Sequence, residues 1–199
     1  HVSAALRYLA MEHADNQAAI ADEGAIPLLI ELLGDSAAVQ CQAAGALWSL
    51  SLNAPDNQAM VAAHEGIEPL VSLLAAGDGP TQETAAGALH CVAETPSNRD
   101  LLVDADAVTQ LAIVFEAGSR EATTEASAAL AALVEGSEER QLVVCEELVR
   151  LLDKGADGDK LHSTAAREHG TALMLHLSRH PAYRGALSKV GAIPQLTMQ

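Results

Sequence analysis

Histidines near the C-terminal end of the sequence are the first residues whose spacing could bind a metal ion. His162, His169 and His176 recur every seven residues, and His180 follows them. A spacing of seven would place the first three on one face of a helix. Neighbours in that row would still lie about 10 Å apart along the helix axis, too far to share one ion. We therefore expect no metal site among them.

Cysteines and clustered aspartates offer equally little chemistry. Cys41, Cys91 and Cys145 are odd in number, widely separated and without the C-x-x-C spacing of zinc or redox sites, so we expect reduced, mostly buried thiols. Asp157 and Asp159 lie in a glycine-containing stretch, but the closing glutamate of a calcium loop is missing. We expect this stretch to be a solvated loop.

Sequence signatures of enzymes are missing as well. The chain contains no G-x-S-x-G, no H-E-x-x-H, no phosphate-binding glycine loop and no dinucleotide fingerprint. Catalysis needs a nucleophile, a base and an orienting group that converge on one pocket. We expect a protein that is not an enzyme and that uses no cofactor.

Charge restricts the class of partner. The 199 residues have a formal net charge of −16, which repels nucleic-acid backbones and anionic lipid surfaces and favours a basic protein segment. An alternative is that the charge serves only solubility. No apolar run of about 18 residues and no signal-peptide pattern is present. We expect no direct membrane insertion and a cytoplasmic location, with nuclear or cytoskeleton-associated locations as alternatives.

The elements that must position any site are short helices in a repeating pattern. Gly24-Ala-Ile-Pro27-Leu-Leu recurs as Gly66-Ile-Glu-Pro69-Leu-Val, and Ala43-Ala-Gly-Ala-Leu recurs as Ala85-Ala-Gly-Ala-Leu. A fixed period near 40 residues with helical spacing inside each unit indicates a stacked array. Only one Phe, one Trp and two Tyr are available, so thin layers of small aliphatic residues must form the core.

Each unit is predicted to contain three helices. In the best-preserved unit, Asp56 would cap a short first helix that ends near Gly66, where glycine can adopt a left-handed conformation. Pro69 would lie in the first turn of the second helix. Residues 77–80 would break that helix, and the third helix would run from about residue 81 to 93.

The whole chain is predicted to be a single array of such units. The third and fourth units lack the Gly and Pro residues that mark the start of the second helix in the other units. We expect their helices to persist with altered entry angles. The predicted segments are the end of a preceding repeat at 1–13, repeats at 14–53, 54–95 and 96–135, a divergent repeat at 136–180 with a loop insertion near 154–160, and the start of a further repeat at 181–199.

The Gly-Ala-Ile-Pro second helix followed by an Ala-Ala-Gly-Ala-Leu third helix resembles the armadillo repeat family, over nearly all of the chain. The resemblance implies an all-α fold, a right-handed superhelical solenoid of three-helix repeats. It also implies that the third helices line one long concave groove, and that this groove binds extended or helical segments of partner proteins.

One branch of the family, importin-α, marks its groove with a Trp and an Asn four residues later. This sequence departs from that pattern at every unit. The Trp positions are occupied by Ala4, Gly45, Gly87, Ala128 and Ala172, and the Asn positions by Tyr8, Ser49, Cys91, Ala132 and His176. An importin-α-like transport adaptor is therefore disfavoured.

Trp48 is the residue best suited to anchor a partner in the implied groove. It follows Gly45 by three residues on the same helix, so its side chain turns roughly toward the concave face. The alternative is packing against a neighbouring third helix. Its counterparts in the other units are Arg7, His90, Ala131 and Leu175. The candidate partner-binding residues are Arg7, Tyr8, Trp48, Ser49, His90, Cys91 and His176.

These expectations favour a non-catalytic scaffold for protein–protein interaction, whose groove binds an extended or helical, basic segment of a partner. The alternative is a structural segment of a longer armadillo array in a cytoskeletal, ciliary or membrane-contact assembly. Concentrated binding energy needs aromatic anchors beside polar donors. The implied groove would be wider and more polar in its first half and nearly featureless around Ala128, Ala131 and Ala132.

Overall fold

The computed structural model describes residues 2–153, 175, 185 and 188–190, and every regular element in that part of the chain is helical. The all-α prediction is confirmed. The elements are α1 (Val2–Ala10), α2 (Ala14–Asp22), α3 (Ala25–Glu31), the 3-10 helix η1 (Leu32–Gly34), α4 (Ala37–Ser51), α5 (Pro55–Ala63), α6 (Ile67–Ala76), α7 (Gly79–Glu94), the 3-10 helix η2 (Pro96–Asn98), α8 (Arg99–Asp104), α9 (Ala107–Ala117), α10 (Arg120–Val134) and α11 (Glu138–Asp153).

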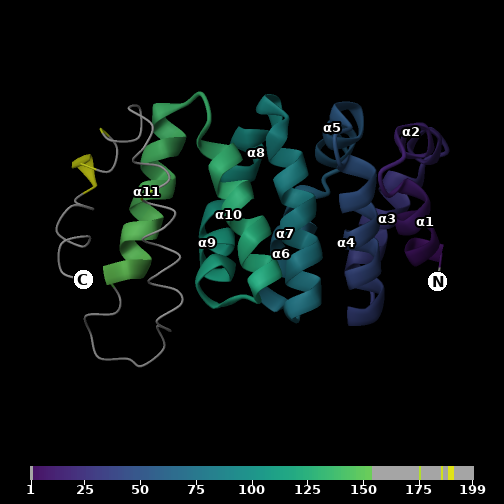
Figure 1. The fold of residues 1–199 in the computed structure, drawn as a ribbon, viewed down its shortest axis with the longest axis horizontal. Coiled ribbons are helices and arrows are strands. Elements are labelled where there is room, and N and C mark those ends of the chain that lie inside the picture. The colour runs from purple at the N-terminus through teal and green to yellow at the C-terminus, as the bar shows by residue number, and fades with distance from the viewer. Residues whose placement is uncertain (1, 154–174, 176–184, 186–187, 191–199) are drawn as a thin grey trace.

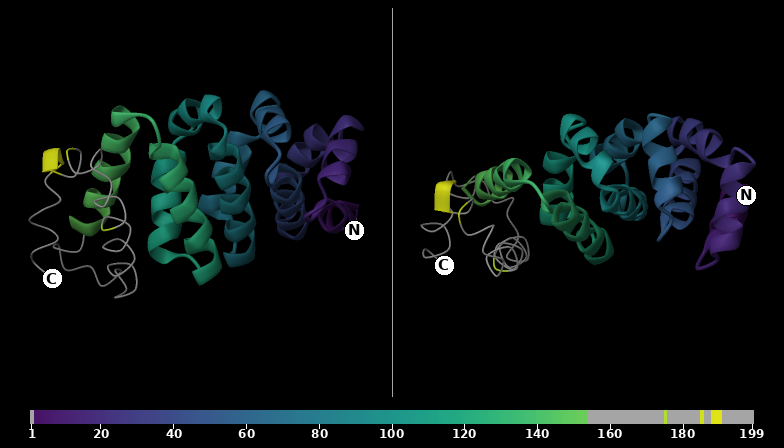
Figure 2. Two further views of the ribbon diagram at one scale, coloured as in Figure 1. Left: turned by 45° about the horizontal axis from the view of Figure 1, so that its top comes forward. Right: turned by 90° about the horizontal axis from the view of Figure 1, so that it is seen from above.

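The third helices of successive units form one continuous layer. Helices α1, α4, α7 and α10 lie side by side, each packed against the next (Figure 1). The second helices α3, α6 and α9 lie behind them, and the short first helices α2, α5 and α8 lie along one edge (Figure 2). The described part is therefore an elongated, curved array, as predicted for a solenoid.

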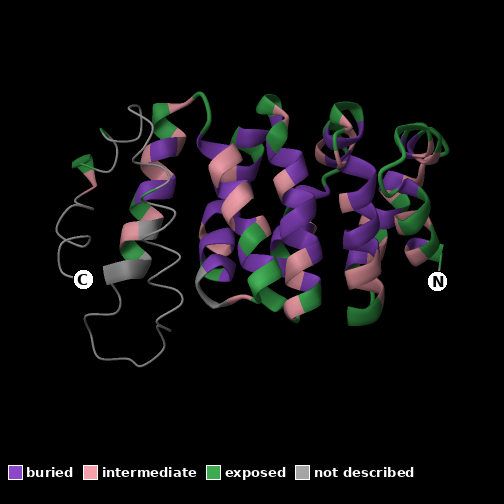
Figure 3. Ribbon diagram, viewed as in Figure 1, coloured by how far each residue is buried: buried purple, intermediate pink, exposed green. Residues whose placement is uncertain are grey.

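Small side chains allow this close packing of helices. Alanine and glycine on the third helices leave room for neighbouring backbones to approach, and leucines fill the remaining space. The same positions are buried in α4 and in α7 (Figure 3): Ala43, Ala44, Ala46, Leu47 and Leu50 in the first, and Ala85, Ala86, Ala88, Leu89 and Val92 in the second.

The turn between the first and second helices contains a left-handed residue at an interval of 41. Gly24, Glu65 and Asp106 have φ angles of 78°, 59° and 60°. The prediction that Gly66 adopts this conformation is wrong, because its φ is −75°. Gly66 is instead needed for close approach, since a Cβ there would lie 2.9 Å from Cδ1 of Ile30 in the preceding unit.

The first and third helices of the second unit begin with different kinds of cap. Asp56 does not cap the first helix of the second unit as predicted, because α5 begins at Pro55 with Ala54 as its N-cap, and Asp56 lies in the first turn. Asp78 caps α7 by accepting hydrogen bonds from the backbone N–H and the hydroxyl of Thr81, at 3.0 and 2.6 Å. Those bonds lower the pKa of Asp78.

The fourth unit departs from the three-helix pattern. Its predicted first and second helices form one continuous helix, α11. Glu147 stands 41 residues after Asp106, but it lies within α11 instead of forming a left-handed turn. Glutamate, leucine and arginine in this segment all favour a helix, and no Gly or Pro interrupts them. The predicted loop near 154–160 lies outside the described residues, as does most of the further unit at 181–199.

No single helix in the described residues combines the length and the apolar composition needed to cross a membrane. By length and composition alone, α5 and α6 meet that requirement only as a pair, and they are bent by 84° at the break between them.

Candidate functional site

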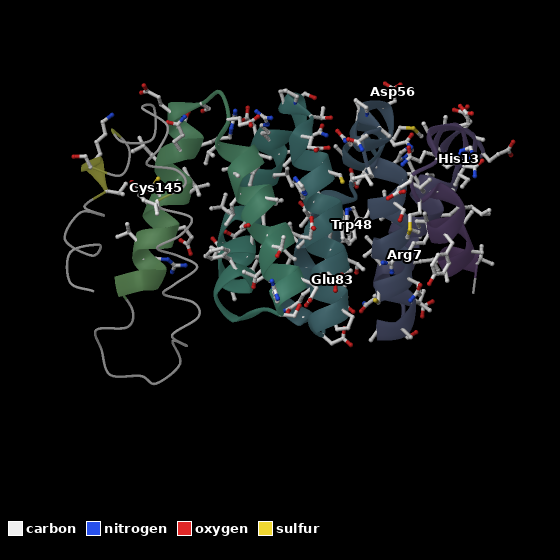
Figure 4. The ribbon with its side chains drawn as sticks, viewed as in Figure 1. Arg7, His13, Trp48, Asp56, Glu83 and Cys145 are labelled. Carbon is white, nitrogen blue, oxygen red and sulfur yellow. The ribbon has the colours of Figure 1, made fainter. Side chains whose placement is uncertain are left out.

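In two places, a large side chain from the third helix of one unit lies directly on the backbone of the third helix of the following unit. A Cβ atom at Gly87 would lie 2.4 Å from Cδ2 and Cε2 of the Trp48 ring, and one at Gly45 would lie 2.9 Å from Nη1 of Arg7. Arg7 therefore fills the joint between α1 and α4, and Trp48 fills the joint between α4 and α7 (Figure 4). Glycine is required under Trp48 because any side chain would overlap the ring.

The joint between α7 and α10 is closed by a polar pair. His90 occupies the position of Arg7 and Trp48, and its Nδ1 lies 3.1 Å from Oε2 of Glu125. Both side chains keep partial solvent access, with 28% and 21% of their surface exposed. On α10, Ala128 stands at the position of the two glycines. This joint therefore combines a hydrogen-bonded pair with an alanine surface.

Cys91 lies beneath this surface, and its thiol is unreactive near neutral pH. It is only 1% exposed, and burial raises its pKa to about 12, with the charges of Glu94 and Glu125 adding to the effect. Burial likewise raises the pKa of Cys145 to about 11. Neither thiol is a nucleophile near neutral pH, because both stay protonated.

The structure places the predicted partner-binding residues at different depths. Arg7, Trp48 and His90 are half-buried and follow one another across the layer, Tyr8 is 73% exposed, Ser49 and Cys91 are buried, and His176 lies outside the described residues. Trp48 is packed between third helices and also retains an accessible part. Which of these residues contacts a partner stays a prediction.

Acidic residues gather on the α7–α10 half of the layer. Glu83 lies one helical turn before Gly87, on the stripe that leads to His90 (Figure 4). Glu121 lies one turn before Glu125 on α10, and it is exposed. The other half of the layer has Arg7 in its first joint. The surface is therefore electrostatically uneven along its length.

Polar side chains of the first helices bind the C-terminal carbonyl groups of the third helices, a feature not predicted from the sequence. Asn57 donates from Nδ2 to the carbonyl oxygens of Leu50 at 2.7 Å and Gln17 at 3.3 Å. Asn98 repeats this with Val92 and Gln58, at 3.2 and 3.3 Å. The last carbonyls of a helix lack partners within it, so these bonds satisfy buried acceptors. We call these contacts the carbonyl clasps.

The residue after each asparagine donates to the C-terminal end of the third helix in its own unit. Gln17 donates to the carbonyl oxygens of Ser49 and Leu52 at 2.8 and 3.1 Å. Arg99 donates from Nη1 to the carbonyl of Glu135 at 2.9 Å and pairs with its carboxylate at 3.1 Å. The sequence signal was available, since Asn16-Gln17, Asn57-Gln58 and Asn98-Arg99 recur every 41 residues.

Within the described residues, no group of three or more His, Cys, Asp or Glu side chains is arranged to hold a metal ion. The described surface therefore consists of partly exposed packing residues and unevenly distributed charge. Such a surface can bind another chain through apolar contact and ion pairing.

Comparisons with known proteins agree with the repeat architecture. The model of the armadillo/beta-catenin-like repeat family matches residues 13–52. A computationally designed armadillo repeat protein for modular peptide recognition is similar over 98% of this chain and 83% of its own, with a TM-score of 0.76 and 22% identity. An engineered protein of the Northeast Structural Genomics Consortium matches over 98% of this chain and 80% of its own, with a TM-score of 0.76 and 25% identity.

A third similar structure holds a ligand. It is a designed armadillo repeat protein in complex with the peptide (KR)4, similar over 97% of this chain and 81% of its own, with a TM-score of 0.74 and 22% identity. No curated protein matches the sequence.

Proposed function

We propose that this chain, whose residues 13–52 match the armadillo repeat model and whose fold is similar to that of designed armadillo repeat proteins, is a non-catalytic scaffold that binds a basic segment of a partner protein along its third helices. The observation that carries the proposal is the juxtaposition of Trp48 with an acidic surface. Trp48 keeps part of its ring accessible between α4 and α7, and Glu83 and Glu121 lie on the two helices beyond it.

The proposed contact has two components. Apolar atoms of the partner segment lie against the accessible part of Trp48, where a large aromatic surface can concentrate binding energy. Basic side chains of the same segment lie near Glu83 and Glu121, and their attraction guides association at long range. Arg7, at the other end of the layer, disfavours basic residues there and gives the segment a preferred direction.

Similar structures support a peptide as the kind of partner. One designed neighbour is described for modular peptide recognition, and another holds the alternating Lys-Arg peptide (KR)4. They share the fold of this chain, and the net charge of −16 suits a basic ligand here as well.

The test uses fluorescently labelled (KR)4 peptide and two matched double variants. Glu83→Gln with Glu121→Gln removes two charges from the third-helix layer, whereas Glu23→Gln with Glu31→Gln removes two exposed charges outside it. We expect anisotropy titrations to show about tenfold weaker binding for the first pair and little change for the second. Binding by the original chain should also weaken steeply with added salt. Equal loss in both pairs, or no salt dependence, would contradict this assignment.

The apolar component has its own measurement. Trp48→Ala should weaken binding of the same peptide by roughly 1–3 kcal/mol. A circular dichroism melt of the variant shows whether the helices remain folded at the titration temperature. Unchanged affinity in a folded variant would remove Trp48 from the binding surface.

A further inference from the structure

A pocket of about 370 Å³ lies outside the third-helix layer, between the second and third units. It is formed where the end of α5 and the start of α6 meet α8 of the next unit. Four apolar residues and three acidic residues line it: Ala62, Ile67, Leu101 and Ala105, with Glu65, Glu68 and Asp104. None of them belongs to α1, α4, α7 or α10.

The pocket combines an apolar interior with a charged rim. Ile67 is only 5% exposed and belongs to the core, while Leu101 is 49% exposed and offers its side chain to solvent. The three carboxylate residues are all exposed. A cavity of this size holds a single long side chain or a small molecule. Its lining suits a ligand with a hydrocarbon stem and a positively charged end.

Acidic residues far outnumber basic ones in this part of the molecule. Residues 2–153 contain 24 Asp and Glu, five Arg and no Lys. Three of those arginines form ion pairs with other carboxylates, Arg7 lies over Gly45, and Arg120 begins α10. Ala62 in the last turn of α5 also lines the pocket, and the C-terminal end of a helix carries a partial negative charge.

The preceding joint of the array shows that the repeat does not demand this charge. At the positions 41 residues earlier, three of the four apolar residues have apolar counterparts and the fourth is replaced by His64. The three acidic residues are replaced by Gly24, Pro27 and Ala63. Glu65 also adopts the left-handed conformation that Gly24 adopts without penalty, which costs a side chain about 1–2 kcal/mol. Packing of the repeat explains the hollow, but it does not explain the acids around it.

We propose that this pocket is a second docking site, which binds a lysine or arginine side chain from a segment of a partner protein. The stem of that side chain lies between Ile67 and Leu101, and its charged end lies among the carboxylates of Glu65, Glu68 and Asp104. The site faces away from the third helices, so it can be occupied together with the groove and independently of it.

Methyl NMR on the full chain tests the site directly. The probes are a blocked hexapeptide with one arginine among alanines and the same peptide with glutamine in place of arginine. We expect the arginine peptide to shift the methyl signals of Ile67 and Leu101 in a saturable way, and the glutamine peptide to leave them unchanged. Equal shifts with both peptides, or none with either, would overturn the proposal.

Matched triple variants distinguish binding at the pocket from long-range attraction by the net charge of the chain. Glu65→Gln, Glu68→Gln and Asp104→Asn together should weaken the arginine peptide about tenfold. Asp22→Asn, Glu23→Gln and Glu31→Gln remove the same charge from the first unit, where Asp22 ends α2 as Asp104 ends α8. The control should stay within twofold of the original chain. Equal weakening in both variants would show long-range attraction only.

Glu65→Gly is a variant that we expect to fold at least as stably as the original chain. It places glycine at the left-handed position, as at Gly24, so the melting temperature should stay the same or rise. Binding of the arginine peptide should nevertheless weaken by several fold. A variant with unchanged binding would contradict the role of Glu65.

Two further outcomes decide the nature of the site. The groove variant Glu83→Gln with Glu121→Gln should leave the Ile67 shift intact; loss of that shift would show that the pocket is not independent. Spermidine should perturb Ile67 and Leu101 less than the arginine peptide at equal concentration. A stronger effect of spermidine would assign the pocket to a small polyamine and overturn the protein segment as its occupant.

Discussion

The joints on either side of α7 are closed by different means. Between α4 and α7, the Trp48 ring lies on the bare backbone of Gly87. Between α7 and α10, His90 and Glu125 meet above a surface that carries Ala128. The first joint depends on shape and the second on a polar contact, although the helices repeat at nearly the same interval. One layer of helices can therefore vary the chemistry of its joints without changing its architecture.

The largest expected effect is at the base of the aromatic joint. Gly87→Val would place side-chain atoms inside the space of the Trp48 ring, so the ring must leave the joint or the helices must separate. We expect a loss of about 3 kcal/mol in the free energy of unfolding, measured by urea denaturation. Adding Trp48→Ala should recover part of that loss, because the overlap is removed. A stable Gly87→Val variant would refute the shape-dependent description of this joint.

A direct comparison of the two joints gives the next largest effect. Trp48→Ala removes a ring that packs against the core, and we expect a loss of about 2 kcal/mol in stability. His90→Ala removes a half-exposed partner of Glu125 and should cost less than about 1 kcal/mol. The measurement is again urea denaturation of both variants. Equal losses would remove the distinction between the joints.

Alkaline pH should lower the free energy of unfolding through the buried thiol of Cys91. Burial raises the thiol pKa to about 12 from the ordinary value of 9.0, so above pH 9 the unfolded chain loses this proton more readily than the folded chain. The contribution to stability is complete below pH 9 and is lost as the pH rises toward 12. At pH 10 the loss is about 1 kcal/mol. Cys91→Ala should lack this part of the pH dependence, and an identical profile would contradict it.

The smallest effect is expected at the glycine under Arg7. Gly45→Ala brings a Cβ to 2.9 Å from Nη1 of Arg7, but the end of an arginine side chain can swing aside. Alanine also favours the helix by up to about 1 kcal/mol. Stability should therefore change by only a few tenths of a kcal/mol. A loss as large as that of Gly87→Val would show that Arg7 is held as rigidly as the Trp48 ring.

Much of the fold was accessible from the sequence because periodicity is a property of many residues at once. The Gly-x-x-Pro and Ala-Ala-Gly-Ala-Leu strings predicted the repeated helices and their order. The fusion of two helices into α11 was missed because the prediction assumed that the fourth unit keeps the turn of the others. Residues 138–153 contain no Gly or Pro to make that turn.

The site was less predictable because it depends on contacts between units. Spacing alone turned Trp48 toward the concave face, but it could not show that the ring would rest on Gly87 in the next helix. Asp56 looked like a cap, but Pro55 begins the helix one residue earlier. The recurring Asn16-Gln17, Asn57-Gln58 and Asn98-Arg99 pairs were visible, but their carbonyl partners lie up to 40 residues away, in the same unit or in the preceding one.

The carbonyl clasps have a mechanical consequence for the whole array. They join one unit to the next at the C-terminal ends of the third helices, where Asn57 and Asn98 donate to the carbonyl oxygens of Leu50 and Val92 in the preceding unit. At the opposite ends, Gln40 and Gln82 donate to Leu33 and Leu74 of their own units. Hydrogen bonds resist stretching more sharply than apolar contacts resist sliding. Neighbouring units can therefore tilt about the edge that carries the carbonyl clasps. The opposite edge of the layer then widens around a bound partner.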